Sequence, residues 1–274
     1  MIVNGPINEK QNLAWKGGVP VPSTRVVAQE RAIALTYCGS TYAVMMATPD
    51  DLEDFGIGFS ITEGVVHGPK EIQSIELIES ELGIEVRMWL ESGRAKSLAS
   101  RRRTIAGAVG CGLCGIESLE QACASPRKVD SFSKFRARDL LDALSALPPL
   151  QRLNQKTGAM HAAAFWDASM GIALVREDIG RHNALDKLAG ALTRSSMSRS
   201  NGAILLTSRV SVEMVQKTAM IGVPVLVAIS APTTLAIETA VHAGITLVAV
   251  ARDDGYEVFT RQDRIDFSSI TQPA

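Results

Sequence analysis

The chain is short of aromatic side chains and of net charge, and both shortages exclude classes of partner. Aromatic residues make up 5% of the 274 residues, too few for a platform on which unpaired bases stack. The formal net charge is -1, so no general attraction draws the chain to nucleic acid or to an anionic membrane. Any polyanion site must therefore be local, and we expect neither nucleic acid nor membrane among the partners.

Long apolar runs and cysteines are scarce as well. The first ten residues lack the apolar core of a signal peptide, and we find no run of about twenty apolar residues. We therefore expect a cytoplasmic protein without a membrane span. The chain has four cysteines, and structural disulfides are rare in a reducing cytoplasm. Hydrophobic residues still make up 46% of the chain, enough for one large core or two smaller ones.

Turn-forming residues and apolar segments divide the first half of the chain. Gly17, Gly18, Pro20 and Pro22 predict that residues 1–25 form a flexible arm. Residues 26–130 are predicted to form an N-terminal α+β region with a mobile loop that carries a Cys-x-x-Cys motif. A helix is expected to begin after Pro49. Strands are expected at residues 32–37, 41–47, 75–79 and 84–90.

The second half alternates between apolar strands and helices. This pattern predicts an α/β domain over residues 131–274, with a sheet covered on both faces. Strands are expected at residues 172–175, 203–206, 225–229, 246–250 and 256–260. Helices are expected at residues 135–147, 183–192, 212–221 and 234–243.

Polar loops follow three of these strands, where ligands bind in α/β proteins. The carboxyl ends of parallel strands meet at one sheet edge, where helix N-termini offer N–H groups and positive dipole ends. Such loops suit a phosphate-bearing ligand, although ordinary helix capping is the alternative. His161 precedes an alanine-rich run, so it is either a core histidine or a site residue. The other candidates are Arg176, Asp178, Gly180, Arg181, His182, Asn183, Lys187, Thr207, Ser208, Arg209, Ser230, Ala231, Pro232 and Thr233.

The pair formed by Cys111 and Cys114 is the chemical centre of the sequence. Two intervening residues let both sulfurs meet one metal ion, one disulfide or one transferred sulfur atom. Zinc would need two further ligands, and the chain has no second cysteine pair. Thioredoxin-like chemistry would place the pair just after a strand, but here it lies in a connector rich in glycine and arginine. On the motif alone, metal binding, redox chemistry and sulfur relay stay open.

Several longer motifs give the chain a specific resemblance. They include Gly110-Cys111-Gly-Leu-Cys114-Gly115, Thr157-Gly-Ala-Met-His161, Thr207-Ser-Arg-Val-Ser211 and Ile229-Ser-Ala-Pro-Thr233. The longest is Val175-Arg-Glu-Asp-Ile-Gly-Arg-His-Asn-Ala-Leu-Asp-Lys187. From about Val27 to the C-terminus, the chain resembles the formate dehydrogenase accessory sulfurtransferase (FdhD) family.

The resemblance implies a function, a fold and partners. The family takes sulfur from a cysteine desulfurase and passes it to molybdenum cofactor before the cofactor enters formate dehydrogenase. Cys111 would carry the persulfide and Cys114 would assist. The later domain would have the three-layer, cytidine-deaminase-like α/β fold without its zinc signature, in a homodimer. It would bind the bis-molybdopterin guanine dinucleotide form of the cofactor, which a guanine nucleotide would mimic.

The resemblance adds a segment to the site and leaves alternatives. The residues Val250, Ala251, Arg252, Asp253, Asp254 and Gly255 match a cofactor-binding segment of the family. The chain departs from the family pattern at two points, because no glycine precedes Arg209 and Asp253 replaces a glycine. A cofactor-binding chaperone without obligatory sulfur transfer is one alternative function. A Cys-x-x-Cys protein that binds metal is the other.

Overall fold

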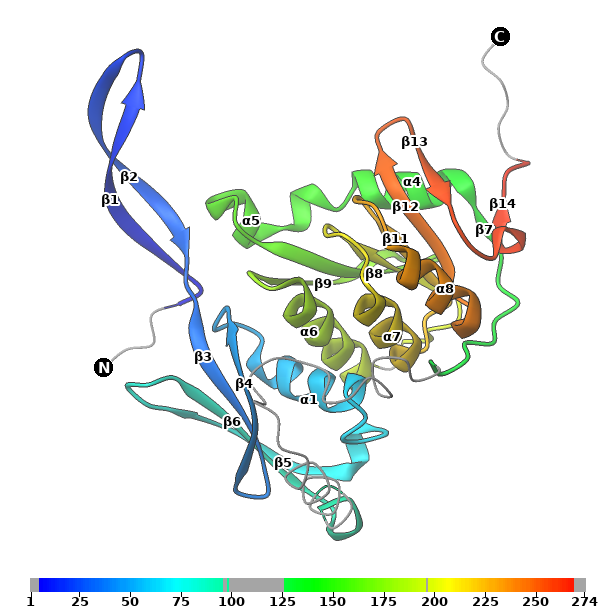
Figure 1. Cartoon of the computed structure of the whole chain (residues 1–274), viewed down its shortest axis with the longest axis horizontal. Helices are drawn as coiled ribbons and strands as arrows, with labels where there is room; N and C mark the ends of the chain where they lie inside the picture. The colour runs from blue at the N-terminus through cyan, green and yellow to red at the C-terminus, as the bar shows by residue number, and fades with distance from the viewer. Residues whose placement is uncertain (1–4, 96–97, 99–125, 196, 269–274) are drawn as a thin grey trace.

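A computed structural model describes residues 5–95, 98, 126–195 and 197–268 (Figure 1). The predicted mobile loop, with Cys111, Cys114 and the arginines of residues 101–103, lies outside these residues. Most of the predicted flexible arm is a regular antiparallel hairpin of β1 (Ile7–Lys16) and β2 (Val19–Ala28). Both turn residues, Gly17 and Gly18, have positive φ angles, as a two-residue hairpin turn of type I′ requires. The glycines that suggested looseness therefore form a tight turn.

The N-terminal region contains a second, four-stranded sheet with one helix against it. Its strands lie in the order β4-β3-β6-β5, and β3 runs parallel to β6. Helix α1 packs on one face, where apolar side chains such as Leu35, Phe55 and Met88 share one buried core. The predicted strands and helix are confirmed, with bounds of β3 (Arg31–Tyr37), β4 (Ser40–Ala47), α1 (Leu52–Thr62), β5 (Ile72–Glu79) and β6 (Ile84–Leu90).

A six-stranded sheet with the order β13-β12-β11-β10-β8-β9 dominates the rest of the chain. Strands β10, β11 and β12 are parallel, and β8 lies antiparallel between β9 and β10. As a result β9 points the same way as β10, β11 and β12, while β8 and β13 point the opposite way. The bounds are β8 (His161–Asp167), β9 (Gly171–Asp178), β10 (Gly202–Leu206), β11 (Val225–Ala228), β12 (Thr246–Arg252) and β13 (Gly255–Val258).

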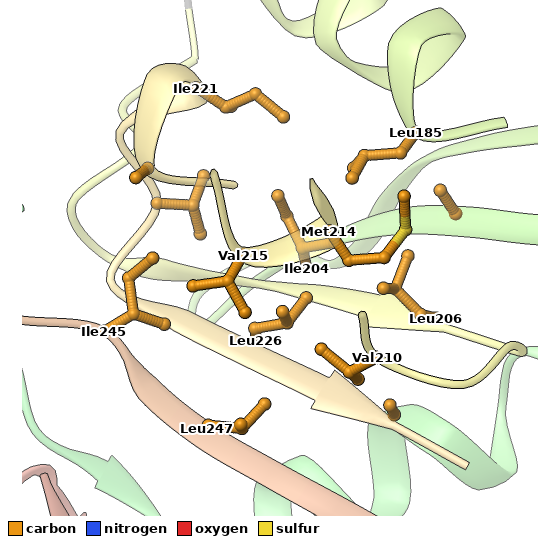
Figure 2. Packing of buried hydrophobic residues seen from close by; sticks show 14 of the residues in the cluster. Leu185, Ile204, Leu206, Val210, Met214, Val215, Ile221, Leu226, Ile245 and Leu247 are labelled. Carbon is orange, nitrogen blue, oxygen red and sulfur yellow. The ribbon is translucent and has the colours of Figure 1, made fainter. Parts of the chain in front are cut away.

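Helices cover both faces of this sheet (Figure 1). On one face, Leu185, Met214 and Ala240 of α6 (Arg181–Arg194), α7 (Val212–Ile221) and α8 (Thr234–Ala243) share a core with Ile204 and Leu226. Figure 2 shows this packing from close by. On the other face, Leu140 and Leu144 of α4 (Ala137–Ser145) pack with Trp166 and Leu205. The α/β class is thereby confirmed, as is the prediction of a sheet covered on both sides.

The sequence did not predict several elements. Besides β1 and β2, the longest of these is β8. Its alanine-rich stretch has no clear alternation of apolar and polar residues. Val129, assigned by prediction to the N-terminal region, packs in the core of the six-stranded sheet. The remaining elements are the helix α5 (Arg152–Thr157), the short strands β7 (Phe135–Arg136) and β14 (Ile265–Asp266), and the 3-10 turns Pro69–Glu71, Pro148–Leu150 and Gln262–Arg264.

Two glycines allow the N-terminal region to pack against helix α6, which covers the six-stranded sheet. At Gly58 of α1, an added Cβ would lie 1.7 Å from the carbonyl oxygen of Asp186. At Gly190 of α6, it would lie 1.9 Å from the carbonyl oxygen of Asp54. The two helix backbones therefore touch where no side chain intervenes. Helix α1 ends up between its own sheet and α6 (Figure 1).

Candidate functional site

The structure brings the predicted polar loops to one edge of the six-stranded sheet. Strands β9 to β12 all end there, and His161 begins β8 opposite Asp178 of β9. Backbone hydrogen bonds join the loops, since Val210 N–H donates to the Ala231 carbonyl over 3.2 Å. In turn, Val250 N–H donates to the Ser230 carbonyl over 3.3 Å. The loops that follow β9, β10, β11 and β12 are thus parts of one surface, which we call the loop edge.

Arg181 and two histidines, His161 and His182, form a group in the loop edge whose positive charge comes from Arg181. Arg181 opens α6, and its Nε atom is buried with no hydrogen-bond partner among the described residues. Burial, followed by the positive charge of Arg181, lowers the pKa of both His161 and His182. Both imidazoles are therefore held neutral near pH 7, beside a guanidinium that can still accept an anionic partner.

Glu213 lies beside this group and was not among the predicted site residues. It is half-buried in the first turn of α7, close to His182 and Arg181. Burial opposes its ionisation, but hydrogen bonds at the helix start and the neighbouring His182 and Arg181 keep its pKa below the usual value. A carboxylate beside Arg181 limits how much negative charge a ligand can place there. The only signal in the sequence was its position two residues after Ser211, a helix-start residue.

Four predicted site residues turn inward and form a buried polar network. Lys187 and Asp178 are both fully buried, with Nζ 2.7 Å from Oδ2. Lys187 also donates to the Thr48 carbonyl, and the Thr48 N–H donates to Asp178. The other Asp178 oxygen accepts hydrogen bonds from Gly180 N–H and the Asn183 amide. Because their polar atoms are used within the protein, these residues hold the start of α6 in place and do not face a ligand.

Arg176 is likewise engaged within the protein. Its guanidinium donates to Asp54 Oδ2 over 2.6 and 2.9 Å, and it lies 3.4 Å from Asp51. Both carboxylates belong to the start of α1. Arg176 therefore ties β9 to α1, a contact that the sequence alone did not suggest.

The hydroxyls of the next two loops also have internal partners. Thr207 accepts a hydrogen bond from Ala162 N–H over 2.8 Å, and Ser208 donates to the Arg209 carbonyl. Thr233 caps α8 by accepting from Ala236 N–H over 3.3 Å. The capping interpretation thus applies to Thr233, while the exposed Arg209, Ala231 and half-buried Pro232 remain available at the surface.

The segment from Val250 to Gly255 forms the end of β12 and the turn into β13. Val250 has a φ of 54°, a left-handed conformation that β-branched residues rarely adopt, at an irregularity in the strand pairing. Arg252 donates to the Ile229 carbonyl, which draws the segment toward the loop after β11. Asp253 and Asp254 are exposed at the turn. The segment thus adjoins the other loops, and its acidic turn points into solvent.

Two cavities are lined by residues other than those predicted for the site. One, of about 240 Å³, is lined by Asp51, Lys156 and Glu177 among others. The second, of about 310 Å³, is lined by Arg136, Trp166 and their neighbours. None of the predicted site residues lines either cavity.

The described residues contain no group of three His, Cys, Asp or Glu side chains placed to hold a metal ion. No helix in the described parts is long and apolar enough to span a membrane. The Cys111–Cys114 pair lies outside the described residues, so metal binding by that pair stays untested.

Comparison with known proteins identifies the family. A sequence model of the FdhD/NarQ family matches residues 28–266. The chain belongs to this family. It is 52% identical over 253 residues to the sulfur carrier protein FdhD of Agrobacterium fabrum, covering 92% of this chain and 93% of that protein. It is 48% identical over 251 residues to the sulfur carrier protein FdhD of Cupriavidus necator, covering 92% and 87%. The resemblance inferred from the motifs is therefore confirmed.

A solved structure confirms the fold. The crystal structure of a proposed formate dehydrogenase accessory protein from Desulfotalea psychrophila superposes with a TM-score of 0.72. It covers 94% of this FdhD/NarQ chain and 99% of that one, at 23% identity. At this identity the likeness supports the arrangement of both sheets and carries no information about residues of the site.

Proposed function

We propose that this FdhD/NarQ chain is a sulfurtransferase that carries sulfur as a persulfide on Cys111. Sulfur comes from a cysteine desulfurase and goes to molybdenum cofactor, before the cofactor is inserted into formate dehydrogenase. The proposal is supported by the family, whose similar members are named sulfur carrier proteins. We place the sulfur transfer in the reducing cytoplasm, where thiols persist. We also propose that the chain acts as a homodimer.

The loop edge is the proposed cradle for the cofactor. The observation that carries this assignment is the buried Arg181 Nε at the N-terminus of α6, which has no hydrogen-bond partner in the part of the chain that the structure describes. A phosphate oxygen of the bis-molybdopterin guanine dinucleotide would supply that partner, with helix N–H groups nearby. Arg209 and the turn from Val250 to Gly255 flank the same edge. A cytidine-deaminase-like topology accords with a six-stranded sheet between two helix layers.

The first chemical step needs a thiolate. The Cys111 thiolate attacks the outer sulfur of the desulfurase persulfide, and the sulfur–sulfur bond of that persulfide breaks. The desulfurase cysteine leaves as a thiolate, and Cys111 becomes the persulfide. This loading step needs no oxidant, because the sulfane sulfur keeps its oxidation state. In the delivery step, the Cys114 thiolate attacks the inner sulfur on Cys111, so the persulfide bond breaks and the outer sulfur leaves as sulfide for the cofactor. The two electrons come from the cysteine pair, which becomes a disulfide and must be reduced by a cellular dithiol before the next cycle.

Mass spectrometry after incubation with a desulfurase and cysteine tests the proposal. We expect one added sulfur atom on the wild-type chain and none on Cys111→Ala. Cys38→Ala is the matched control, because Cys38 is a half-buried cysteine in the turn between β3 and β4 and should leave loading unchanged. An undiminished adduct on Cys111→Ala would contradict the assignment.

The same variants distinguish the alternatives. A chain with both Cys111→Ala and Cys114→Ala that still matures formate dehydrogenase fully would be a cofactor chaperone. Stoichiometric zinc in freshly purified protein, lost in that double variant, would identify a metal-binding pair.

A further inference from the structure

The hairpin of β1 and β2 projects away from the other helices and strands (Figure 1). Its base is fixed, since Arg25 donates to the Thr157 carbonyl over 3.3 Å and Gln29 N–H donates to the Pro6 carbonyl. At the tip, Leu13 is 67% exposed and Trp15 is 72% exposed. An isolated two-stranded hairpin is at best marginally stable in water. We therefore expect a partner to cover the apolar side chains at the tip of the hairpin.

The prolines show which edge of the hairpin is open. Pro22 lies opposite Leu13, and Pro20 lies opposite Trp15. Proline has no N–H, so these cannot be the pairs that exchange hydrogen bonds between β1 and β2. The outer edge of β2 thus presents two prolines without N–H groups, which block the addition of a strand.

The outer edge of β1 has no such block. By the same alternation, Glu9, Gln11, Leu13 and Trp15 direct their N–H and C=O groups outward. Among the described residues, no other strand pairs with β1. One edge is closed and the other is open over the length of the strand.

We propose that β1 pairs antiparallel with β1 of a second copy of this chain. The two hairpins then form one sheet in the order β2-β1-β1-β2, with a two-fold axis at its centre. This interface rests on the homodimer proposed above and specifies where it forms.

The charge pattern of β1 suits this self-pairing. Outward residues must face outward residues, and the register that pairs most of β1 centres on Gln11. In that register Ile7 faces Trp15, Glu9 faces Leu13 and Lys10 faces Asn12, so no like charges are opposed. A shift of the centre to Leu13 would set Lys10 against Lys16, which disfavours that register.

The exposed side chains of the hairpin can contribute to the area that a stable dimer interface buries. A stable interface buries about 800 Å² per partner. One enclosed tryptophan contributes about 150–250 Å². Trp15, Leu13 and the paired strand edge therefore supply part of the required area.

Proline substitution at the centre of β1 tests the interface. Gln11→Pro removes an outward N–H and keeps every hydrogen bond between β1 and β2, whereas Gln11→Ala keeps that N–H and is the matched control. We expect sedimentation equilibrium to show a wild-type dimer with twice the 29.3 kDa of one chain. Gln11→Pro should weaken dimerisation about tenfold or more, because symmetry removes two hydrogen bonds. Trp15→Lys should weaken it as well, without touching the backbone.

A crosslink checks the register. In a chain with Cys111→Ala and Cys114→Ala, Gln11→Cys should form a disulfide between copies upon mild oxidation, because paired residues lie about 5.5 Å apart. Asn12→Cys should do so far less, because Asn12 faces Lys10. A monomeric wild type, a Gln11→Pro dimer as tight as wild type, or a hairpin that only pairs with another protein would each overturn the proposal. Sulfur loading of Cys111, measured on Gln11→Pro, reports separately on the proposed function.

Discussion

At the scale of single residues, the polar groups of the long motif divide into two sets. Arg181 and His182 face the loop edge, whereas Asp178, Asn183 and Lys187 turn inward. The inward set connects to Thr48, which belongs to the N-terminal region. Residues that look like ligand contacts in the sequence thus hold the proposed ligand contacts, Arg181 and His182, in position.

Lys187→Met should strongly destabilise the fold. It would leave the Asp178 carboxylate fully buried without its cation, and breaking a buried ion pair costs about 3–5 kcal/mol. Urea unfolding would show the loss as a lower midpoint. The exposed Lys156→Met is the control and should change the midpoint little. Equal midpoints for the two variants would mean that the pair contributes nothing.

At the scale of elements, the contact between α1 and α6 holds the two sheets together. The side chains around it add ion pairs, since Arg194 lies 3.0 Å from Asp54 and Lys217 lies 2.9 Å from Asp186. The contact itself depends on Gly58 and Gly190, because only glycine lets the backbones meet.

Gly190→Ala should destabilise the protein although alanine is the better helix former. The new Cβ would meet backbone atoms of Asp54, which cannot move aside cheaply, and overpacking costs about 1–3 kcal/mol. Gly93→Ala is the matched control, because Gly93 is helical and has no atom within 4 Å of an added Cβ. That control should gain up to about 1 kcal/mol. Thermal unfolding of both variants measures the difference, and a stabilised Gly190→Ala would refute the close contact.

At the scale of the whole molecule, the N-terminal sheet and the six-stranded sheet should unfold as one unit. Helix α1 is shared between them, and the networks of Lys187 and Lys217 cross the same boundary. Calorimetry should therefore give a single transition whose calorimetric and van't Hoff enthalpies agree. Two resolved transitions would show instead that the predicted regions 26–130 and 131–274 are independent.

The sequence alone determined the α/β class, most strands and helices, and the family. Apolar runs between helical periods are local signals, and motifs such as the one from Val175 to Lys187 are read without coordinates. The glycines and prolines of the hairpin led to the prediction of a flexible arm, because the same residues suit a loose arm and a tight turn. The sequence did not predict strand β8, because a run of alanines suits either a strand or a helix.

Only the tertiary structure decided how these pieces cooperate. Inserting β8 between β9 and β10 brings His161 to the edge where β9 to β12 end. Whether a polar side chain faces solvent or the interior depends on partners far along the chain, as for Arg176 with Asp54 and Lys187 with Thr48. Sequence pattern records the type and spacing of residues, but these pairings arise only when separate segments meet in the folded chain.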